Sequence, residues 1–145
     1  MKRKGIDFVY APNGDMMLPA GISKIAALGF RDDLFIIPRS SIAGAGRTVE
    51  TTTYSVGGKP MLEAVEAWIS DPSVSLDDFR ESVKVALSEQ PGTHFRVNEL
   101  KEFRIRNSWF SRGLYFKKQG AGGFTGCSIR DKTLVAEFQS FYGQG

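Results

Sequence analysis

Few residues in this sequence have the chemistry for catalysis, and their spacing does not bring them together. His94 is the single histidine and Cys127 the single cysteine. A Ser-His-Asp or Cys-His arrangement would need His94 as its base. The preceding Pro91-Gly92-Thr93 is typical of a loop, where a solvated histidine is the simpler interpretation. Cys127 alternates in step with Ile129, which predicts a small buried side chain. We therefore predict a protein that is not an enzyme.

The sequence also predicts no metal site and no cofactor. One cysteine and one histidine cannot supply the three or four nitrogen and sulfur ligands of a typical zinc site. The acidic residues Asp71, Asp77, Asp78 and Glu81 match no calcium loop. Helix capping accounts for most of these carboxylates.

Two glycine clusters are candidates for phosphate binding. Gly44–Thr48 lacks the Gly-Lys-Ser/Thr ending of a P-loop and runs into a β-branched stretch instead of a helix, which favours a simple turn. Gly120–Gly123 follows Lys117 and Lys118, so it could bind an anion, but a hairpin tip flanked by solubilising charges is the favoured interpretation.

The most informative pattern lies in the last third of the chain, where cations and aromatic rings alternate with apolar residues. Successive side chains of a strand point to opposite faces of a sheet. The apolar set is Phe103, Ile105, Leu114, Phe116, Cys127 and Ile129, and the other set is Arg104, Arg106, Tyr115, Lys117, Phe124 and Arg130. Cations can neutralise phosphates, and aromatic rings can stack unpaired bases. This pattern predicts a face for single-stranded nucleic acid or another polyanion.

Two large rings, Trp109 and Phe110, follow Arg106 and precede Arg112 in a connection between two of these strands. Such a tip could stack bases, dip into a membrane interface or fold back onto the core. An ordinary solvated face, or one covered by the N-terminal strands, remains the alternative for the basic face. The candidate binding residues are Arg104, Arg106, Trp109, Phe110, Arg112, Tyr115, Lys117, Phe124 and Arg130.

These residues are positioned by a predicted three-stranded meander over 100–106, 113–118 and 124–130. A helix is expected to open at Asp131 and end at Gly143. Its apolar positions would cover the inner side of the meander, and they are Leu134, Val135, Phe138, Phe141 and Tyr142.

Two helices are predicted in the middle of the chain. One begins after Pro60 and stops near Asp71-Pro72, with an apolar stripe of Met61, Leu62, Val65, Trp68 and Ile69. The other is capped by Ser75, with Phe79, Val83, Ala86 and Leu87 on its buried side, and closes at Pro91-Gly92.

The first 58 residues read as strands. We expect a strand at 6–10, a turn at 12–15 and a hairpin return over 16–19. Residues 22–30 suit a strand better than a short helix, with a turn at 31–33 before a strand that Pro38 ends. A last strand is expected within 48–56, ending at Gly57-Gly58.

The predicted fold is therefore one α+β domain over residues 1–145, with antiparallel sheet, two central helices and a C-terminal helix packed on the meander. Its parts are the β-rich 1–58, the helical 59–92 and the meander plus helix 93–145. The element order of the last part resembles that of bacterial pleckstrin-homology-like domains and of PC4/Whirly-type single-strand binders. The resemblance rests on element order over about 50 residues and transfers no functional residue.

The charge distribution, the length of the apolar runs and the single cysteine agree with such a domain. The formal charge is +3 overall, but it is uneven, with +2 over 1–58, −4 over 59–92 and +5 over 93–145. We expect no transmembrane segment, because no apolar run reaches roughly 20 residues, and no signal peptide, because Gly5-Ile6-Asp7 interrupts the start. With one cysteine, a reducing, cytoplasmic location is expected.

The functional prediction is a noncatalytic binding module whose basic and aromatic face meets a polyanion, single-stranded nucleic acid first. The alternative is a structural or protein-interaction domain, such as a phage-like or plasmid-like assembly piece or a pleckstrin-homology-like adaptor. In that case Trp109, Phe110 and the acidic middle helices would contact a second copy or another protein.

Overall fold

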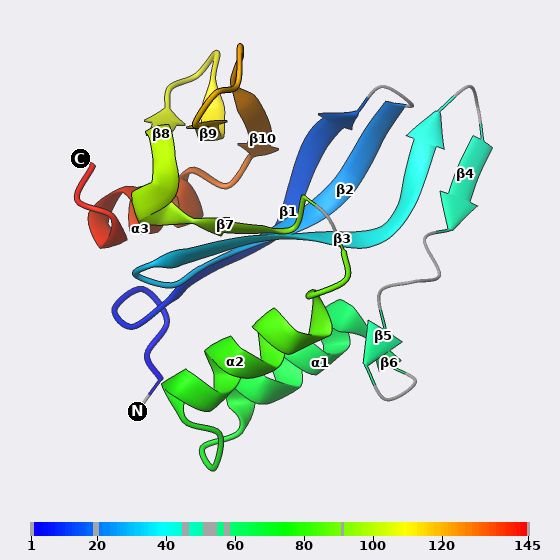
Figure 1. Cartoon of the computed structure of the whole chain (residues 1–145), viewed down its shortest axis with the longest axis vertical. Helices are drawn as coiled ribbons and strands as arrows, with labels where there is room; N and C mark the ends of the chain where they lie inside the picture. The colour runs from blue at the N-terminus through cyan, green and yellow to red at the C-terminus, as the bar shows by residue number, and fades with distance from the viewer. Residues whose placement is uncertain are drawn as a thin grey trace.

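An antiparallel sheet bent toward a barrel, with helices on two sides, forms the framework of the protein (Figure 1). The computed structural model describes residues 2–18, 21–44, 47–50, 55–56, 59–90 and 92–144. The strands of the main sheet are β1 (Val9–Leu18), β2 (Gly21–Gly29), β3 (Asp33–Gly44), β4 (Arg47–Glu50), β7 (His94–Arg96), β8 (Leu100–Asn107), β9 (Arg112–Lys118) and β10 (Thr125–Ile129). The helices are α1 (Met61–Ser70), α2 (Leu76–Ala86) and α3 (Lys132–Phe141), and β5 (Ser55–Val56) pairs with β6 (Lys59–Pro60). The α+β class is confirmed.

The N-terminal strands and the C-terminal meander share one sheet, in the order β4-β3-β2-β1-β10-β9-β8. The β7 strand pairs with the start of β3, and the chain then passes through a 3-10 turn at Val97–Glu99 into β8. One continuous segment therefore runs from one side of the sheet to the other and nearly closes it.

Apolar side chains gather in two separate cores, one on each side of β1–β3. The inner core lies between the bent sheet and α3, and it includes Val9, Ile36, Phe116, Val135 and Phe138. The outer core lies between β1–β3 and the helices α1 and α2, and it includes Phe8, Leu28, Phe35, Val65 and Phe79. Strands buried on both faces need apolar residues at consecutive positions, which accounts for the unbroken run Leu34–Ile37.

The helix ends follow the capping chemistry predicted from the sequence. The Ser75 hydroxyl accepts a hydrogen bond from the Asp78 backbone N–H at 3.1 Å at the start of α2. The Asp131 carboxylate accepts from the backbone N–H groups of Thr133 and Leu134 at the start of α3. Gly143, with φ of 72°, follows that helix. These local signals placed the starts of both helices correctly, but α2 ends at Ala86, before the predicted end at Pro91-Gly92.

The C-terminal segment also protects the edge strand β8. The Gln144 side chain accepts from the Ile105 backbone N–H at 2.8 Å and donates to the Phe103 carbonyl at 2.9 Å. The Gln139 amide donates to the Ile105 carbonyl at 3.1 Å. Because these groups would otherwise be open to another strand, the side chains block strand addition at this point of the edge.

Three expectations for the N-terminal strands were wrong. The strand expected at 6–10 begins only at Val9, after a turn at 5–7. Residues 12–15 form no hairpin turn, because β1 continues through them with a register shift between Ala11 and Gly14. Pro12 has no N–H to donate, so a bulge accommodates it within the strand. Pro38 does not end β3, which runs to Gly44, and the shift in the facing strand next to Ile25 accommodates this second proline.

Other expectations are tested only in part. The strand at 22–30 and its turn at 31–33 are confirmed by β2 and the start of β3. The strand predicted within 48–56 is described at 47–50 and 55–56. Its predicted end at Gly57-Gly58, the centre of the Gly44–Thr48 turn, Pro19 and Pro91 lie outside the described residues.

The β9–β10 pairing gives a sharp test of the sheet. Gly113 has φ of +148°, and an added Cβ would lie 2.1 Å from the Cys127 carbonyl oxygen. We expect Gly113→Ala to lower the free energy of unfolding by about 2 kcal/mol or more, because both backbone strain and a main-chain clash oppose it. Gly122→Ala is the matched control, since a Cβ there meets nothing within 4 Å. Urea denaturation measures the free energy of unfolding of the two variants. Equal values for Gly113→Ala and Gly122→Ala would contradict the register of the β9–β10 pair.

Candidate polyanion interface

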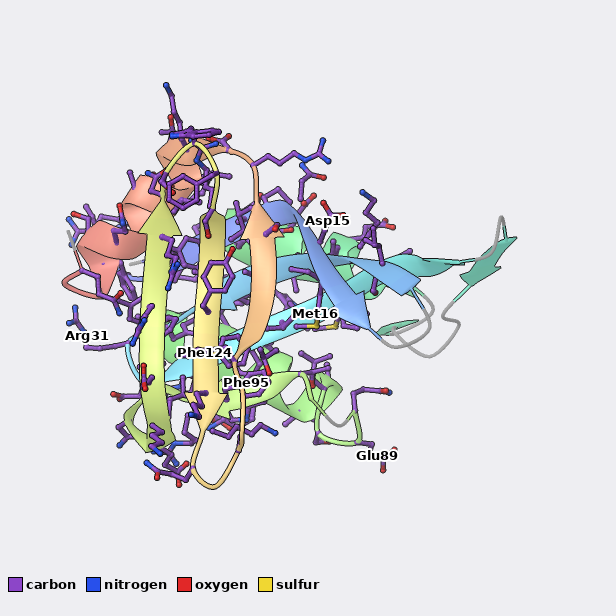
Figure 2. All side chains as sticks on the ribbon, turned by 90° about the horizontal axis from the view of Figure 1, so that it is seen from above. Asp15, Met16, Arg31, Glu89, Phe95 and Phe124 are labelled. Atoms are coloured by element: carbon purple, nitrogen blue, oxygen red, sulfur yellow. The ribbon has the colours of Figure 1, made fainter. Side chains whose placement is uncertain are left out.

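The outer side of β8, β9 and β10 is open, whereas α1 and α2 cover the outer side of β1–β3 near Phe8 and Leu28. Figure 2 looks onto this open side, with α1 and α2 behind the sheet. The apolar residues Ile105, Leu114, Phe116, Cys127 and Ile129 are buried on the inner side. Phe103 is half-buried at the edge of the same core. The N-terminal strands therefore extend the sheet and do not cover its basic face.

The opposite set of residues lies on the open side, which confirms the predicted alternation. Arg104, Arg106, Phe124 and Arg130 are exposed, and Tyr115 and Lys117 are half-buried. Whether this face binds a polyanion stays a prediction.

Cross-strand register brings cations onto rings. The Arg106 guanidinium carbon lies 5.5 Å from the centroid of the Tyr115 ring. Arg104 and Lys117 lie 5.2 Å and 5.8 Å from the centroid of Phe124. Arg104, Arg106 and Lys117 thus lie over aromatic rings of the same face.

Tyr115 is held flat on the sheet by its neighbours. It pairs with Gly126, where an added Cβ would lie 2.8 Å from Cδ1 of the tyrosine ring. The Ser111 hydroxyl donates a hydrogen bond to the Tyr115 hydroxyl at 3.1 Å. The missing side chain at Gly126 therefore makes room for the ring to lie across β10.

The cations differ in their partners. Arg104 forms an ion pair with Glu102 at 2.7 Å. Arg112 donates from Nε to the Asn107 side-chain oxygen at 2.8 Å and from Nη1 to the Arg130 carbonyl at 3.4 Å, which fixes its position. Among the described residues, no ion pair involves Arg106, Lys117, Arg112 or Arg130. Much of the positive charge is thus not neutralised by a close carboxylate.

Trp109 and Phe110 project from the β8–β9 connection. Their side chains are 90% and 71% exposed and pack edge to face on each other, with ring centroids 5.4 Å apart. The turn is closed by reciprocal backbone hydrogen bonds between Ser108 and Ser111. The option that this tip folds back onto the core is wrong.

A hollow of about 500 Å³ lies between this tip and the far ends of β1 and β2. Sequence reasoning missed the residues on its β1–β2 side, which are Asp15, Ile22 and Lys24. The Lys24 ammonium and the Asp15 carboxylate form an ion pair at 2.7 Å. No local signal could have found them, because they reach the basic face only through the β1–β10 pairing.

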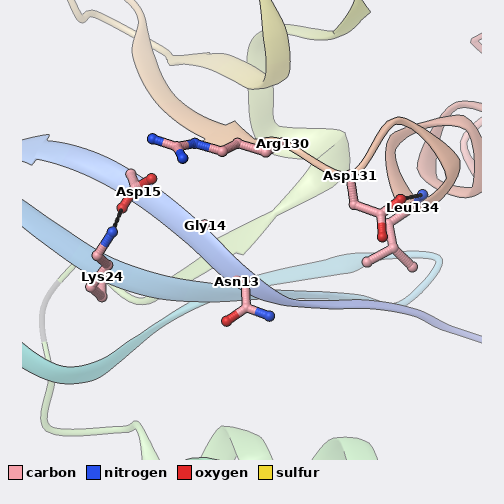
Figure 3. A pocket seen from close by; sticks show the side chains of 7 residues that line it. All are labelled: Asn13, Gly14, Asp15, Lys24, Arg130, Asp131 and Leu134. Carbon is pink, nitrogen blue, oxygen red and sulfur yellow. Dashed lines mark hydrogen bonds and ion pairs between the residues drawn. The ribbon is translucent and has the colours of Figure 1, made fainter.

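A smaller hollow of about 290 Å³ adjoins the first, with Asp131 and Leu134 in its lining. Figure 3 shows the Arg130 side chain extending from the end of β10 toward the Asp15–Lys24 pair. Arg130 therefore lies between the two hollows, and both share Asp15, Lys24 and Arg130 as lining residues.

His94 is not a solvated loop residue, which corrects the sequence interpretation. It lies in β7, half-buried, with its ring stacked on Phe35 at a centroid distance of 4.6 Å. Its Nε2 is 2.6 Å from Oδ1 of Asp33, whose side chain is only 6% exposed. The pair joins β7 to β3, and this position gives His94 a structural role in closing the sheet.

Cys127 is fully buried, as predicted, and burial raises the pKa of its thiol to about 12. The neutral thiol packs as a small apolar group in the inner core.

Burial likewise raises the pKa of the Tyr142 hydroxyl. This hydroxyl donates a hydrogen bond to the Phe30 carbonyl at 2.7 Å and so links the end of α3 to the β2–β3 turn.

Within the described residues, no group of three or more His, Cys, Asp or Glu side chains is arranged to hold a metal ion. None of the helices in the same parts of the chain has the length and apolarity needed to cross a membrane.

Comparison with known proteins gives no family for this chain. No family model matches it, and neither a curated protein nor a solved structure matches it significantly.

The Asp33–His94 contact predicts a measurable coupling. Removing the histidine with His94→Ala leaves a buried carboxylate without this partner and should lower the free energy of unfolding by about 2 kcal/mol. Asp33→Ala should cost a similar amount, and the double variant should cost clearly less than the sum of the two. Thermal or urea unfolding of the wild type, the two single variants and the double variant gives the four free energies of unfolding. If the two single losses of stability add exactly to that of the double variant, the interaction is contradicted.

Proposed function

We propose that this chain is a noncatalytic binding module whose open outer face docks a polyanion, single-stranded nucleic acid first. The observation that carries the proposal is the placement of Arg104, Arg106 and Lys117 against the rings of Tyr115 and Phe124 on a side of the sheet that α1 and α2 leave uncovered. Single-strand binders combine these two components, since cations follow the phosphates and rings stack the bases.

The rings are available for stacking even though cations lie over them. An exposed cation–π pair contributes about 0.5 to 1 kcal/mol, whereas stacking of a base on an aromatic ring contributes about 1 to 3 kcal/mol. A base can therefore displace Arg104 from Phe124 or Arg106 from Tyr115. The displaced guanidinium then lies beside the strand, where it can contact a phosphate.

The size of the open face suits a short single strand. The order β8-β9-β10-β1-β2 contains four strand spacings, and neighbouring strands lie about 4.8 Å apart, which gives a width of about 19 Å. Single-strand binding folds of similar size accept about four nucleotides or more. The strand would cross the β-strands and meet a cation or a ring from most of them.

Protein interaction is the second candidate, and the exposed Trp109–Phe110 tip favours it. Tryptophan is enriched among the residues that dominate protein interfaces. On this view the tip, and not the basic sheet, would be the centre of the contact, with a second copy of the chain or another protein as the partner.

Salt-dependent titration tests the leading proposal. Labelled single-stranded DNA and RNA should bind, and affinity should fall steeply as salt rises, because each neutralised phosphate contributes about 0.7 to the logarithmic slope. Arg104→Ala combined with Arg106→Ala should weaken binding and reduce the slope by about 1.4. Circular dichroism should show both proteins folded.

The matched control is Lys4→Ala combined with Lys84→Ala, which removes two cations at exposed or half-exposed positions outside the basic face. It should leave affinity and slope nearly unchanged. Equal losses in both double variants would indicate nonspecific attraction, and no binding by the wild type would reject the proposal. A concentration-dependent oligomer that ignores nucleic acid would support the second candidate instead.

A further inference from the structure

We infer that the hollow between the Trp109–Phe110 tip and the ends of β1 and β2 is a subsite for one unpaired nucleotide. The inference rests on the proposed function and names the part of the polyanion that this region takes. It extends the basic face from β10 onto β1 and β2, through residues that the sequence pattern did not indicate.

The shape of the hollow supports this occupant. Its volume of about 500 Å³ falls within the range of about 300 to 1,000 Å³ for small-ligand sites. Two small residues of β10, Gly126 and Ser128, line it, and they pair with Tyr115 of β9 and Asp15 of β1 respectively. Tyr115 lies on one side of them and Trp109 at the tip, so a flat base has an aromatic face available to it.

The charges around the hollow favour a phosphate. Lys24, Arg112 and Arg130 contribute three cations to its lining, and Asp15 contributes the one carboxylate. The carboxylate is already paired with Lys24 at 2.7 Å. The guanidinium of Arg130 extends toward that pair without forming an ion pair among the described residues (Figure 3), so a phosphate between Arg130 and Lys24 would meet positive charge from both sides.

The same geometry selects an unpaired base. Inside a duplex the faces of a base are covered by the neighbouring base pairs, and they become available to a protein ring only in a single strand or after extrusion. Tyr115 belongs both to the basic face and to the hollow. A single strand lying on the face can therefore place one base in the hollow, whereas a duplex cannot without unstacking.

Filling the hollow tests the inference without removing any cation. Ser128 is exposed on β10 and lines the hollow, so Ser128→Phe should occupy the space of the base. We expect the affinity for a single-stranded 12-mer to fall about tenfold, in line with the loss of one stacked base, with an unchanged salt slope. Ser140→Phe, at an exposed serine of α3, is the matched control and should bind like the wild type.

Tryptophan fluorescence provides the second measurement. Trp109 is 90% exposed, so a base that enters the hollow should quench its emission. The single-stranded 12-mer should quench the wild type, the Ser128→Phe protein should lose this quenching, and a duplex of the same sequence should cause little. Trp68 in α1 gives a constant background in all these proteins.

A second variant keeps the test independent of how Ser128→Phe folds. Lys24→Ala removes a cation from the β2 side of the hollow and frees the Asp15 carboxylate to repel a phosphate. The affinity for the single strand should therefore fall by more than the removal of one phosphate contact alone would cause. If the wild type binds single strands but Ser128→Phe and Lys24→Ala both match it, the subsite is wrong and the proposed function stands. If the wild type binds no nucleic acid, the nucleotide subsite and the proposed function are both overturned.

Discussion

The packing of the apolar face of α3 against the inner side of the bent sheet decides which side of the meander strands faces water. Val135 and Phe138 pack in the inner core with Phe116, Leu114 and Ile129. Because side chains alternate along a strand, a register shift of one residue would exchange the two faces completely. Such a shift would bring cations into the apolar interior, at a cost of several kcal/mol for each unpaired charge. The burial of the apolar face of α3 and the exposure of the basic face thus follow from the same strand register.

The same sheet supports two different surfaces along its outer side. Around Phe8 and Leu28 the outer side of β1–β3 forms the floor of a second core beneath α1 and α2. Farther along β1 and β2, Asp15 and Lys24 lie beyond these helices and continue the open side of β10. The helices therefore limit the basic face at one border, and the Trp109–Phe110 tip limits it at another.

Local chemistry made part of this structure predictable. Ser75 and Asp131 cap helices through their own backbone neighbours, and the meander alternates with a two-residue period from Phe103 onward. Both features can therefore be predicted from short segments of the sequence. The bulge at Pro12 was not, because the same residue types favour a hairpin turn and a bulge alike. Asp33 and His94 are 61 residues apart, and only the closure of the sheet brings them together.

The candidate site also has one part that the sequence predicts and one part that it does not. Its half on β8–β10 follows from alternation within one stretch of chain, whereas Lys24 and Asp15 join it only through the β1–β10 ladder. Pairing between strands that are more than 100 residues apart leaves no local pattern in the sequence. The exposure of Trp109 and Phe110 was likewise undecided, since an aromatic pair in a connection is compatible with both a buried and an exposed position.

Chemical-shift mapping of the backbone amides during titration with a short single-stranded oligonucleotide tests the central claim most directly. The account predicts salt-sensitive shifts on the outer side of β8, β9 and β10, around Arg104, Tyr115 and Arg130, that extend to Lys24 in β2. Residues of α1 and α2 should stay unchanged. Shifts confined to those helices, or none at all at low salt, would contradict it.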